Sequence, residues 1–375
     1  MRGGWGGHPS CFDHALPQIR CSYNHFSRGP HMQLSFLSFV PNHGGPRGAA
    51  ASLADGVRLF QTAEREGYDT GWVRVRHFEP YLSSPMVFLS AVAQRTSSLH
   101  FGTGVLPMRY EDPIRVAEDA ATLDLMSGGR LELGLSSGIP TQSMLDPVFG
   151  PSELSFSAEA QKRALRLRAV LAGDALINSG EGYMSIPPHT DLTLSPPVPG
   201  LAERLWYGSG TVAGARRTGA QGFDLQVSTL NGEETGVSFD EGQLQQILAY
   251  KEAFAAGQAA GTISAARVPR IAAGRIIVPL LTDEDRAVHR EFIEGYESGM
   301  GADGRPLDPR VPLRFSRILA GHPDEIVDAL LADRALPHAS QLMVTLPANG
   351  AVASHERILR IVRERIAPAL LPVLA

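Results

Sequence analysis

The stretch SGGRLELGLSSG, residues 127–138, decides how this chain folds. Its three leucines alternate with Arg130, Glu132 and Gly134, and this period of two is typical of a β-strand. One face of the strand is therefore apolar, whereas the other carries two charges and the strand runs into Ser-Ser-Gly. Such a strand either lies at the wet edge of an open sheet, or is buried with its charges paired inside and its end free to hold a ligand.

The composition is that of an ordinary globular enzyme. Of the 375 residues, 43% are hydrophobic and 19% are charged, and the formal net charge is −5. No basic stripe indicates a nucleic-acid partner, and no run of about 18 apolar residues indicates a membrane span. Both cysteines lie in the first 31 residues, so the rest of the chain offers neither a cysteine nucleophile nor a zinc cluster, and we expect no metal site.

The beginning of the chain differs from the rest. Residues 1–31 show neither helical nor strand periodicity and lack the apolar core of a secretory signal. We therefore expect residues 1–31 to be a disordered extension and residues 32–375 to form a single domain. The missing signal favours the cytoplasm.

From residue 33 onward, short apolar strands alternate with amphipathic helices. Eight strands are predicted, at 33–40, 69–78, 99–107, 130–135, 204–210, 223–230, 270–278 and 341–347. Repeats of this kind build parallel sheets, and eight of them favour an α/β fold of the closed (β/α)₈, or TIM-barrel, type. A proline-rich insertion at 174–203 follows the fourth strand. A dinucleotide-binding sheet is disfavoured because no Gly-x-Gly-x-x-Gly turn follows the first strand.

A barrel assigns the two faces of the opening stretch. The leucines pack outward on helices, so Arg130, Glu132 and Gly134 point into the lumen. An unpaired buried carboxylate is very costly, so Glu132 needs a cation. Alternation places Arg74 of the second strand on the inward face, and we predict that it pairs with Glu132. The alternative is that the faces are reversed and the charges meet a solvated gap.

Active sites of such barrels lie at the carboxyl ends of the strands. The residues at these ends are Arg76, His77, Thr103, Gly104, Ser136, Ser137, Gly208, Ser209, Gly210 and Thr211. The last four precede a helix, and exposed amides, hydroxyls and a helix N-terminus together form an anion site, although a simple strand-helix turn uses the same residues. Strand alternation places Arg76 inward and His77 outward.

These blocks resemble one family. FGTGVLP (101–107) followed by DPIRVAEDAATLDLMSGGRLELGLSSG (112–138) is similar to the bacterial luciferase-like monooxygenases, which are flavin-dependent (β/α)₈ enzymes. The similarity extends through WVRVRHF, WYGSGTVAGARRTGAQGFD and GHPDEIVDALL, and covers nearly the whole chain from Met32. The resemblance implies a barrel that binds FMN, or in a sister branch a deazaflavin, at the strand ends.

The resemblance also implies where the cofactor lies. The FMN phosphate would suit Gly208–Thr211, with Ser136 and Ser137 as further donors. Thr103 and Gly104 match the position beside the isoalloxazine ring, where the family often has a non-proline cis peptide bond.

Two residues depart from the family pattern. Arg76 stands where the family often has a histidine, and Ser137 where it often has an arginine on the phosphate. The Arg76 cation would stabilise negative charge on the oxygenated flavin, and His77 would act as an acid or base. The alternatives are a salt bridge at the top of the lumen for Arg76 and a structural role for His77. A hydroxyl binds phosphate more weakly than a guanidinium, so Arg216 or Arg217 would compensate.

The implied reaction is oxygenation of an unidentified small organic substrate by reduced FMN and O₂. A separate NAD(P)H flavin reductase would supply the reduced flavin, and the loops and the 174–203 insertion would set the substrate. Two alternatives stay open: a deazaflavin-dependent dehydrogenase on the same fold, and a flavin-binding protein without turnover. The resemblance further implies a homodimer or larger assembly.

Overall fold

The computed structural model describes residues 32–42, 44–138, 142–232, 236–301, 305–308 and 313–374. The extension predicted at 1–31 lies outside the described residues.

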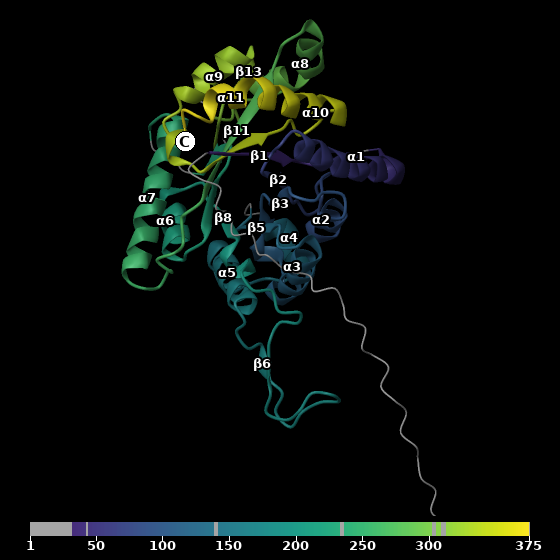
Figure 1. The fold of residues 1–375 in the computed structure, drawn as a ribbon, viewed down its shortest axis with the longest axis vertical. Helices are drawn as coiled ribbons and strands as arrows, with labels where there is room; N and C mark the ends of the chain where they lie inside the picture. The colour runs from purple at the N-terminus through teal and green to yellow at the C-terminus, as the bar shows by residue number, and fades with distance from the viewer. Residues whose placement is uncertain are drawn as a thin grey trace, which may run out of the picture.

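Eight parallel strands close into a barrel (Figure 1), as the sequence predicts. Each strand pairs with the next around the ring, and β11 closes it by pairing with both β14 and β9. The strands of the ring are β1 (Gln33–Ser38), β2 (Thr70–Val73), β3 (His100–Thr103), β5 (Leu131–Ser136), β8 (Leu205–Gly208), β9 (Asp224–Val227), β11 (Ile271–Pro279) and β14 (Gln341–Thr345).

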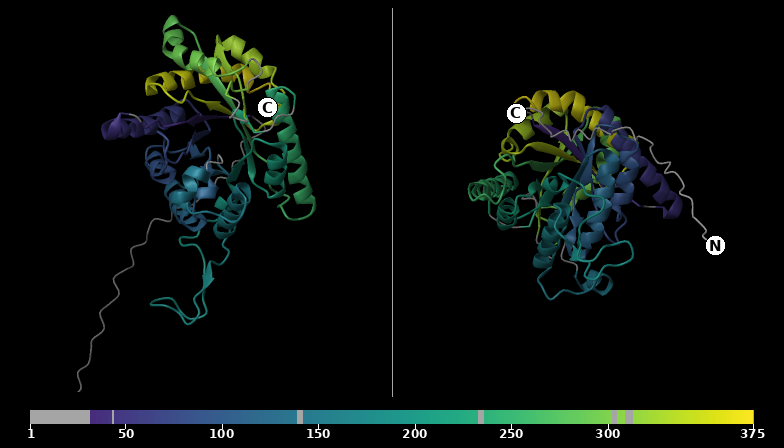
Figure 2. Two further views of the ribbon diagram at one scale, coloured as in Figure 1. Left: turned by 180° about the vertical axis from the view of Figure 1, so that it is seen from behind. Right: turned by 60° about the horizontal axis from the view of Figure 1, so that its bottom comes forward.

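Helices cover the outside of this ring (Figure 2). They are α1 (Gly45–Arg65), α2 (Pro85–Ala93), α3 (Pro113–Ser127), α4 (Gln142–Phe149), α5 (Phe156–Leu171), α6 (Val212–Ala220), α7 (Phe239–Ala259), α8 (Asp283–Ser298), α9 (Pro323–Leu331), α10 (Val352–Ile361) and α11 (Ala367–Leu370). A π-helical turn, Val362–Ile366, joins α10 to α11.

The helix that leads into the opening stretch shows how the sequence sets its boundaries. The Asp112 carboxylate caps α3 by accepting hydrogen bonds from the amides of Ile114 and Arg115, both at 2.9 Å. Pro113 occupies the first turn, where its missing N–H costs nothing. Gly128 ends the helix in the left-handed region, with a φ of 70° that favours glycine. β5 therefore begins at a well-defined point after the turn.

Some segments contain more, and shorter, strands than the sequence predicts. The strand predicted at 99–107 is two strands, β3 and β4 (Leu106–Pro107), with a cis peptide bond between Gly104 and Val105. The segment between α8 and α9 contains β12 (Arg314–Phe315) and β13 (Ile318–Gly321). β12 pairs with β10 (Leu230–Asn231), and β13 extends the sheet along β11.

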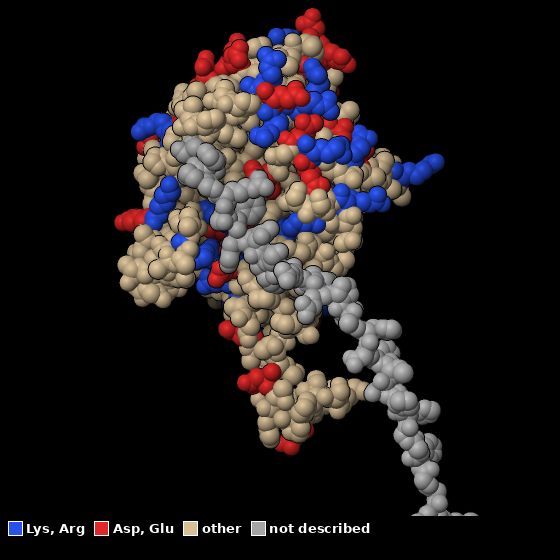
Figure 3. All heavy atoms as spheres, viewed as in Figure 1, with Lys and Arg blue, Asp and Glu red and all other residues tan. Residues whose placement is uncertain are grey.

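The insertion forms an arm that projects from the barrel at the bottom of Figure 1. Its two short strands, β6 (Ile177–Asn178) and β7 (Asp191–Leu192), are antiparallel. Between residues 174 and 199 it carries acidic residues but no lysine or arginine, as Figure 3 shows. Because it connects the end of α5 to the start of β8, it leaves the barrel at the amino ends of the strands. The expectation that it helps to set the substrate is therefore wrong for a site at the carboxyl ends.

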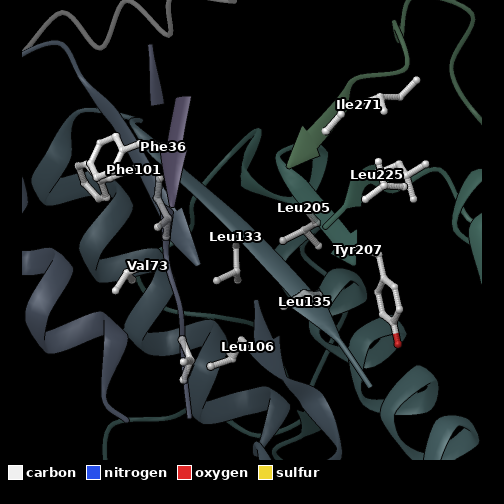
Figure 4. Close-up of a cluster of buried hydrophobic side chains, with 14 of the residues drawn as sticks. Phe36, Val73, Phe101, Leu106, Leu133, Leu135, Leu205, Tyr207, Leu225 and Ile271 are labelled. Atoms are coloured by element: carbon white, nitrogen blue, oxygen red, sulfur yellow. The ribbon is translucent and has the colours of Figure 1, made fainter. Parts of the chain in front are cut away.

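The two faces of each strand contribute to different clusters. Leu133 and Leu135 belong to the outer core together with Val73, Phe101 and Leu205 (Figure 4), which confirms that the leucines face the helices. A separate cluster fills the lumen, and consists of Leu37, Trp72, Trp206, Ala272 and Met343. The two tryptophan rings in it meet edge to face at 5.4 Å between centroids.

Candidate active site

The lower lumen contains a closed network of charges around Glu132. Arg270, just before β11, donates two hydrogen bonds to its carboxylate at 3.1 and 3.0 Å. The indole Nε1 of Trp206 donates a third at 2.7 Å, and His100 Nδ1 lies 3.3 Å from Oε1. Arg270 also pairs with Asp224 at 2.6 Å. Burial opposes ionisation of Glu132, but Arg270 and His100 outweigh it and hold the pKa of Glu132 well below its usual range.

The predicted pair between Glu132 and Arg74 is therefore wrong. The strand register aligns Glu132 with Gly102, and Gly102 with Trp72. Arg74 follows Trp72 by two residues, so it belongs to the next layer up, toward the carboxyl ends.

Arg130 also differs from its predicted place in the lumen. It precedes β5, so the alternation of the strand does not yet apply to it. Its guanidinium donates to the carbonyl of Ala93, at the C-terminal end of α2, at 2.8 Å. It also donates to the carbonyl of Leu99 at 3.0 Å and lies 5.2 Å from the centroid of the Phe101 ring. Arg130 therefore ties α2 to β3 beneath the barrel.

Above the tryptophans, the upper lumen is lined by glycines. Gly134 and Gly208 come two residues after lumen residues of β5 and β8, and a Cβ added at Gly104 would meet Leu37 and Trp72 side chains. Two polar atoms on other strands are buried without a hydrogen-bond partner among the described residues, Nε2 of Gln226 and Oγ1 of Thr345. The upper lumen therefore combines positions without side chains with polar groups that lack partners among the described residues.

Thr103 and Gly104 lie in the wall between β3 and β5. The Thr103 side chain is fully buried and donates a hydrogen bond from Oγ1 to the carbonyl of Gly134 at 2.6 Å. Its hydroxyl is thus used within the wall, whereas Gly104 faces the lumen side chains of Leu37 and Trp72. The cis peptide bond between Gly104 and Val105 lies where the family resemblance implies a non-proline cis bond.

The structure brings the serines after β5 next to the turn after β8. Leu135 pairs with Tyr207, so the two strand ends are neighbours. Ser137 Oγ lies 3.1 Å from the Tyr207 hydroxyl, and Ser136 Oγ accepts a hydrogen bond from the Gly138 amide at 3.1 Å.

The turn Gly208–Thr211 is shaped to present the N-terminus of α6. Thr211 is the N-cap, and its Oγ1 accepts a hydrogen bond from the Gly214 amide at 3.0 Å. Ser209 Oγ donates to the Thr211 carbonyl at 3.1 Å. A Cβ at Gly214 would lie only 2.3 Å from Ser209 Oγ and 2.9 Å from Thr211 Oγ1, so a larger residue there would displace these hydroxyls. Amides and hydroxyls of this kind suit an anion.

The two arginines of α6 differ in their surroundings. Arg216 pairs with Glu252 of α7 at 2.8 Å, which places its guanidinium on the flank of the barrel. Arg217 is exposed, and its charge acts on the Tyr207 hydroxyl beside Ser137. The expectation that Arg216 compensates for Ser137 is therefore wrong.

Arg76 and His77 occupy different surroundings after β2. Arg76 is half-buried, and its Nε lies 3.5 Å from Glu79 Oε1 without forming a hydrogen bond. Burial lowers the pKa of Arg76, and Glu79 partly offsets this. His77 Nε2 lies 3.2 Å from Glu111 Oε1, and its ring lies 4.9 Å from that of Phe149.

His77 also borders a hollow of about 290 Å³ between α2 and α3, outside the barrel. A second hollow, of about 410 Å³, lies between the start of α3 and α5, and is likewise outside the lumen. We place the candidate site at the strand ends rather than at these hollows, because glycines of β5 and β8 and the unpartnered atoms of Gln226 and Thr345 lie there on the lumen face.

Three residues of the upper lumen were missed by the sequence analysis of the site. Gln226 and Thr345 share the faces of Asp224 and Met343, so the alternation of β9 and β14 would have indicated them. Arg74, assigned to Glu132, instead lies with its guanidinium 5.2 Å from the centroid of the Phe39 ring.

The comparisons place the chain in a family. Residues 32–235 match the family model described as luciferase-like monooxygenase. The chain belongs to the luciferase-like monooxygenase family.

Curated relatives of this family member match it over part of their length. A 4-hydroxyprotoasukamycin monooxygenase of Streptomyces nodosus subsp. asukaensis is 34% identical over 28% of this chain and 29% of its own. The oxygenase component of a flavin-dependent trigonelline monooxygenase of Acinetobacter baylyi is 32% identical over 22% of this chain and 23% of its own. The chain thus spans about a quarter of the length of each of these relatives.

Solved structures share the fold across nearly the whole chain. The oxygenating constituent of 3,6-diketocamphane monooxygenase from Pseudomonas putida, in complex with FMN, is 16% identical, with a TM-score of 0.66 over 91% of this chain and 99% of that chain. An F420-dependent secondary alcohol dehydrogenase is 17% identical, with a TM-score of 0.61 over 90% and 99%.

The described residues contain no helix that is long and apolar enough to cross a membrane. They also bring together no group of three or more histidine, cysteine, aspartate or glutamate side chains suited to a metal ion.

Proposed function

We propose that this luciferase-like protein is an FMN-dependent monooxygenase that uses reduced FMN and O₂ to oxygenate a small organic substrate. The observation that carries the proposal is the upper lumen, where glycines of three strands place no side chain beside the buried polar atoms of Gln226 and Thr345. An amide N–H and a hydroxyl suit the carbonyl and nitrogen atoms of a flat heterocycle, and Trp72 and Trp206 form an apolar floor beneath it. The residues present therefore fit the isoalloxazine ring.

The phosphate of FMN has a separate set of donors. The turn Gly208–Thr211 and the N-terminus of α6 would hold it, with Ser136 and Ser137 beside them. Thr103 would position Gly104 beside the ring through its bond to Gly134. When bound, reduced FMN supplies the electrons for the reaction with O₂.

The protein contributes charge and exclusion of water. Arg76 is a fixed cation at the mouth, and fixed positive charge stabilises negative charge that develops during oxygen activation. The fully buried cluster below the mouth keeps water away from the floor of the site. His77 contacts Glu111 on the outside, and we assign it to holding the loop after β2 rather than to proton transfer in the lumen.

Two partners accompany this proposal. A separate NAD(P)H flavin reductase would supply reduced FMN, in line with the name of the trigonelline relative, which is an oxygenase component. A second copy of the chain would form a homodimer or larger assembly.

Two other functions are distinguishable from this one. A deazaflavin-dependent dehydrogenase is favoured by the shared fold with an F420-dependent dehydrogenase. A flavin-binding protein without turnover is favoured by the serine at 137, which lacks the charge of an arginine.

The test is an anaerobic titration of the purified protein with reduced FMN, followed by admission of oxygen while the absorption spectrum is recorded. We expect saturable binding and then a transient band that matches neither reduced nor oxidised FMN. Binding followed by simple reoxidation, at the rate of free flavin, would favour the protein without turnover. Tight binding of a reduced deazaflavin with no binding of FMN would favour the dehydrogenase.

A further inference from the structure

Arg74 stands at the mouth of the barrel without a counter-ion. It follows β2 directly, and its backbone amide donates to the Ser38 carbonyl at 2.9 Å. Its guanidinium lies over the ring of Phe39, 5.2 Å from the centroid. Among the described residues, no carboxylate lies within ion-pair distance of it and no side-chain hydrogen bond holds it.

Most other buried arginines among the described residues bind carboxylates, and the buried Arg130 instead donates hydrogen bonds to backbone carbonyls. Arg270 binds Glu132 and Asp224, and the side-chain nitrogens of three more lie 2.7–2.8 Å from carboxylate oxygens, namely Arg204 to Asp124, Arg109 to Asp146 and Arg275 to Asp333. Arg74 is instead only half-buried, and burial together with the neighbouring Arg76 lowers its pKa to about 10. It therefore stays a cation at neutral pH, but one whose solvation is reduced and whose charge the described part of the chain leaves unmatched.

The surroundings of Arg74 add a second cation and two aromatic rings. Arg76 lies two residues further along the chain, beyond the end of β2, and its charge lowers the pKa of Arg74. Its acid partner Glu79 is exposed, with Oε1 3.5 Å from Arg76 Nε. The ring of Tyr81 lies 5.7 Å from that of Phe39. Phe39 supports one face of the guanidinium, so the edge with its N–H donors is free to bind a ligand.

The flavin phosphate does not account for this cation. Gly208–Thr211 follows β8, which is three steps round the barrel wall from β2 through β3 and β5. Each step is ~4.8 Å, so a phosphate held at α6 is too far away to contact Arg74. A second anionic group is needed to match Arg74.

We propose that Arg74, with Arg76 beside it, binds a carboxylate of the organic substrate at the mouth of the barrel. The planar guanidinium of Arg74 matches a carboxylate with two parallel hydrogen bonds, and the Phe39 and Tyr81 rings receive the apolar part of the same molecule. The identification of this carboxylate as part of the substrate rests on the proposed monooxygenase function, whereas the carboxylate site itself does not depend on that function.

The test measures binding of benzoate, with benzamide as its neutral counterpart, by ligand-observed NMR titration of the full chain. The unsubstituted protein should bind benzoate at least tenfold more tightly than benzamide. Arg74→Met should weaken benzoate binding by about ten- to a hundredfold, the range expected for charge-assisted hydrogen bonds, and leave benzamide unchanged. Arg74→Lys should restore part of the loss. Arg95→Met, which removes an exposed arginine beyond the C-terminal end of α2, should change benzoate binding less than twofold.

Three results would overturn the proposal. The first is equal binding of benzoate and benzamide by the unsubstituted protein, which decides the matter even if Arg74→Met does not fold. The second is unchanged benzoate binding in an Arg74→Met variant that melts at the normal temperature. The third is displacement of benzoate by an equal concentration of inorganic phosphate, which would assign Arg74 to the flavin phosphate instead.

The outcome is separable from that of the proposed function. If FMN binds and reacts with oxygen but Arg74→Met leaves benzoate binding intact, the function stands and the carboxylate site fails. If benzoate binding depends on Arg74 but reduced FMN does not bind, the site stands and the function fails.

Discussion

The lower and upper halves of the lumen are built from the same strands but treat their polar groups in opposite ways. In the lower half, Glu132 is satisfied by Arg270, Trp206 and His100. In the upper half, two residues further along β5, Gly134 replaces a side chain altogether. A buried charge whose partners the chain supplies belongs to the fold, whereas glycine positions beside unmatched polar groups are suited to a ligand.

The contrast predicts that substitutions in the two halves of the lumen have different effects. Substitutions in the lower layer should reduce the free energy of unfolding. Substitutions in the upper layer should change ligand binding while the fold persists.

The largest effect is expected for Glu132→Gln. It leaves Arg270 short of one buried counter-ion, and breaking a buried pair from one side costs about 3–5 kcal/mol. Urea unfolding should show this loss. The matched control is Glu79→Gln at the mouth, where the carboxylate is 46% exposed, and we expect a change of less than about 1 kcal/mol. Similar losses for the two variants would abolish the distinction between the layers.

The contribution of Glu132 to the free energy of unfolding should depend on pH. The folded pKa of Glu132 lies below its ordinary value of 4.5, so its contribution is complete above about pH 5 and declines as pH falls below 4.5 toward the folded pKa. The difference in unfolding free energy between the unsubstituted protein and Glu132→Gln should therefore shrink on acidification through this range. A difference that stays constant from pH 7 to pH 3 would show that the pKa of Glu132 is not depressed by folding.

The sequence could predict the barrel because the alternation of strands and helices is local. It could also place the leucines of β5 outward, since a strand has only two faces. It could not supply the partner of Glu132, because Arg270 is 138 positions away and only the strand register puts the two in one layer. Arg130 was misplaced because a pattern of period two does not show where the strand begins.

Only part of the candidate site could be predicted from the sequence. Gly208–Thr211 and the two serines could be proposed because strand ends and glycine-rich turns are visible in the sequence. The alternation of β9 and β14 would have placed Gln226 and Thr345 in the lumen, but only the structure shows that their buried polar atoms have no partner among the described residues.

Two glycines of neighbouring strands should respond differently to a methyl group. A Cβ at Gly134 would lie 2.0 Å from the Thr103 carbonyl oxygen, so Gly134→Ala should force the strands apart and destabilise the protein by about 1–3 kcal/mol. A Cβ at Gly208 would come no closer than 3.2 Å to Val105, so Gly208→Ala should fold with a normal melting temperature.

The Gly208→Ala methyl group would nevertheless occupy space in the upper lumen. We expect FMN to bind about tenfold more weakly, equivalent to about 1.4 kcal/mol, in a fluorescence titration. Unchanged affinity in the folded variant would show that the flavin does not approach the end of β8.

The smallest effect is expected for Ser137→Arg, and it has the opposite sign. Ser137 contacts Tyr207 beside the turn that presents α6, and Arg216 is held away from that turn by Glu252. A guanidinium at 137 would add a charge-assisted bond that neither residue provides, and should tighten FMN binding by up to about tenfold. Ser137→Ala, which removes the hydroxyl without adding charge, should not tighten it. If Ser137→Arg binds FMN no better than the unsubstituted protein, the phosphate lies elsewhere, and the unmatched cation at Arg74 becomes the first place to look for it.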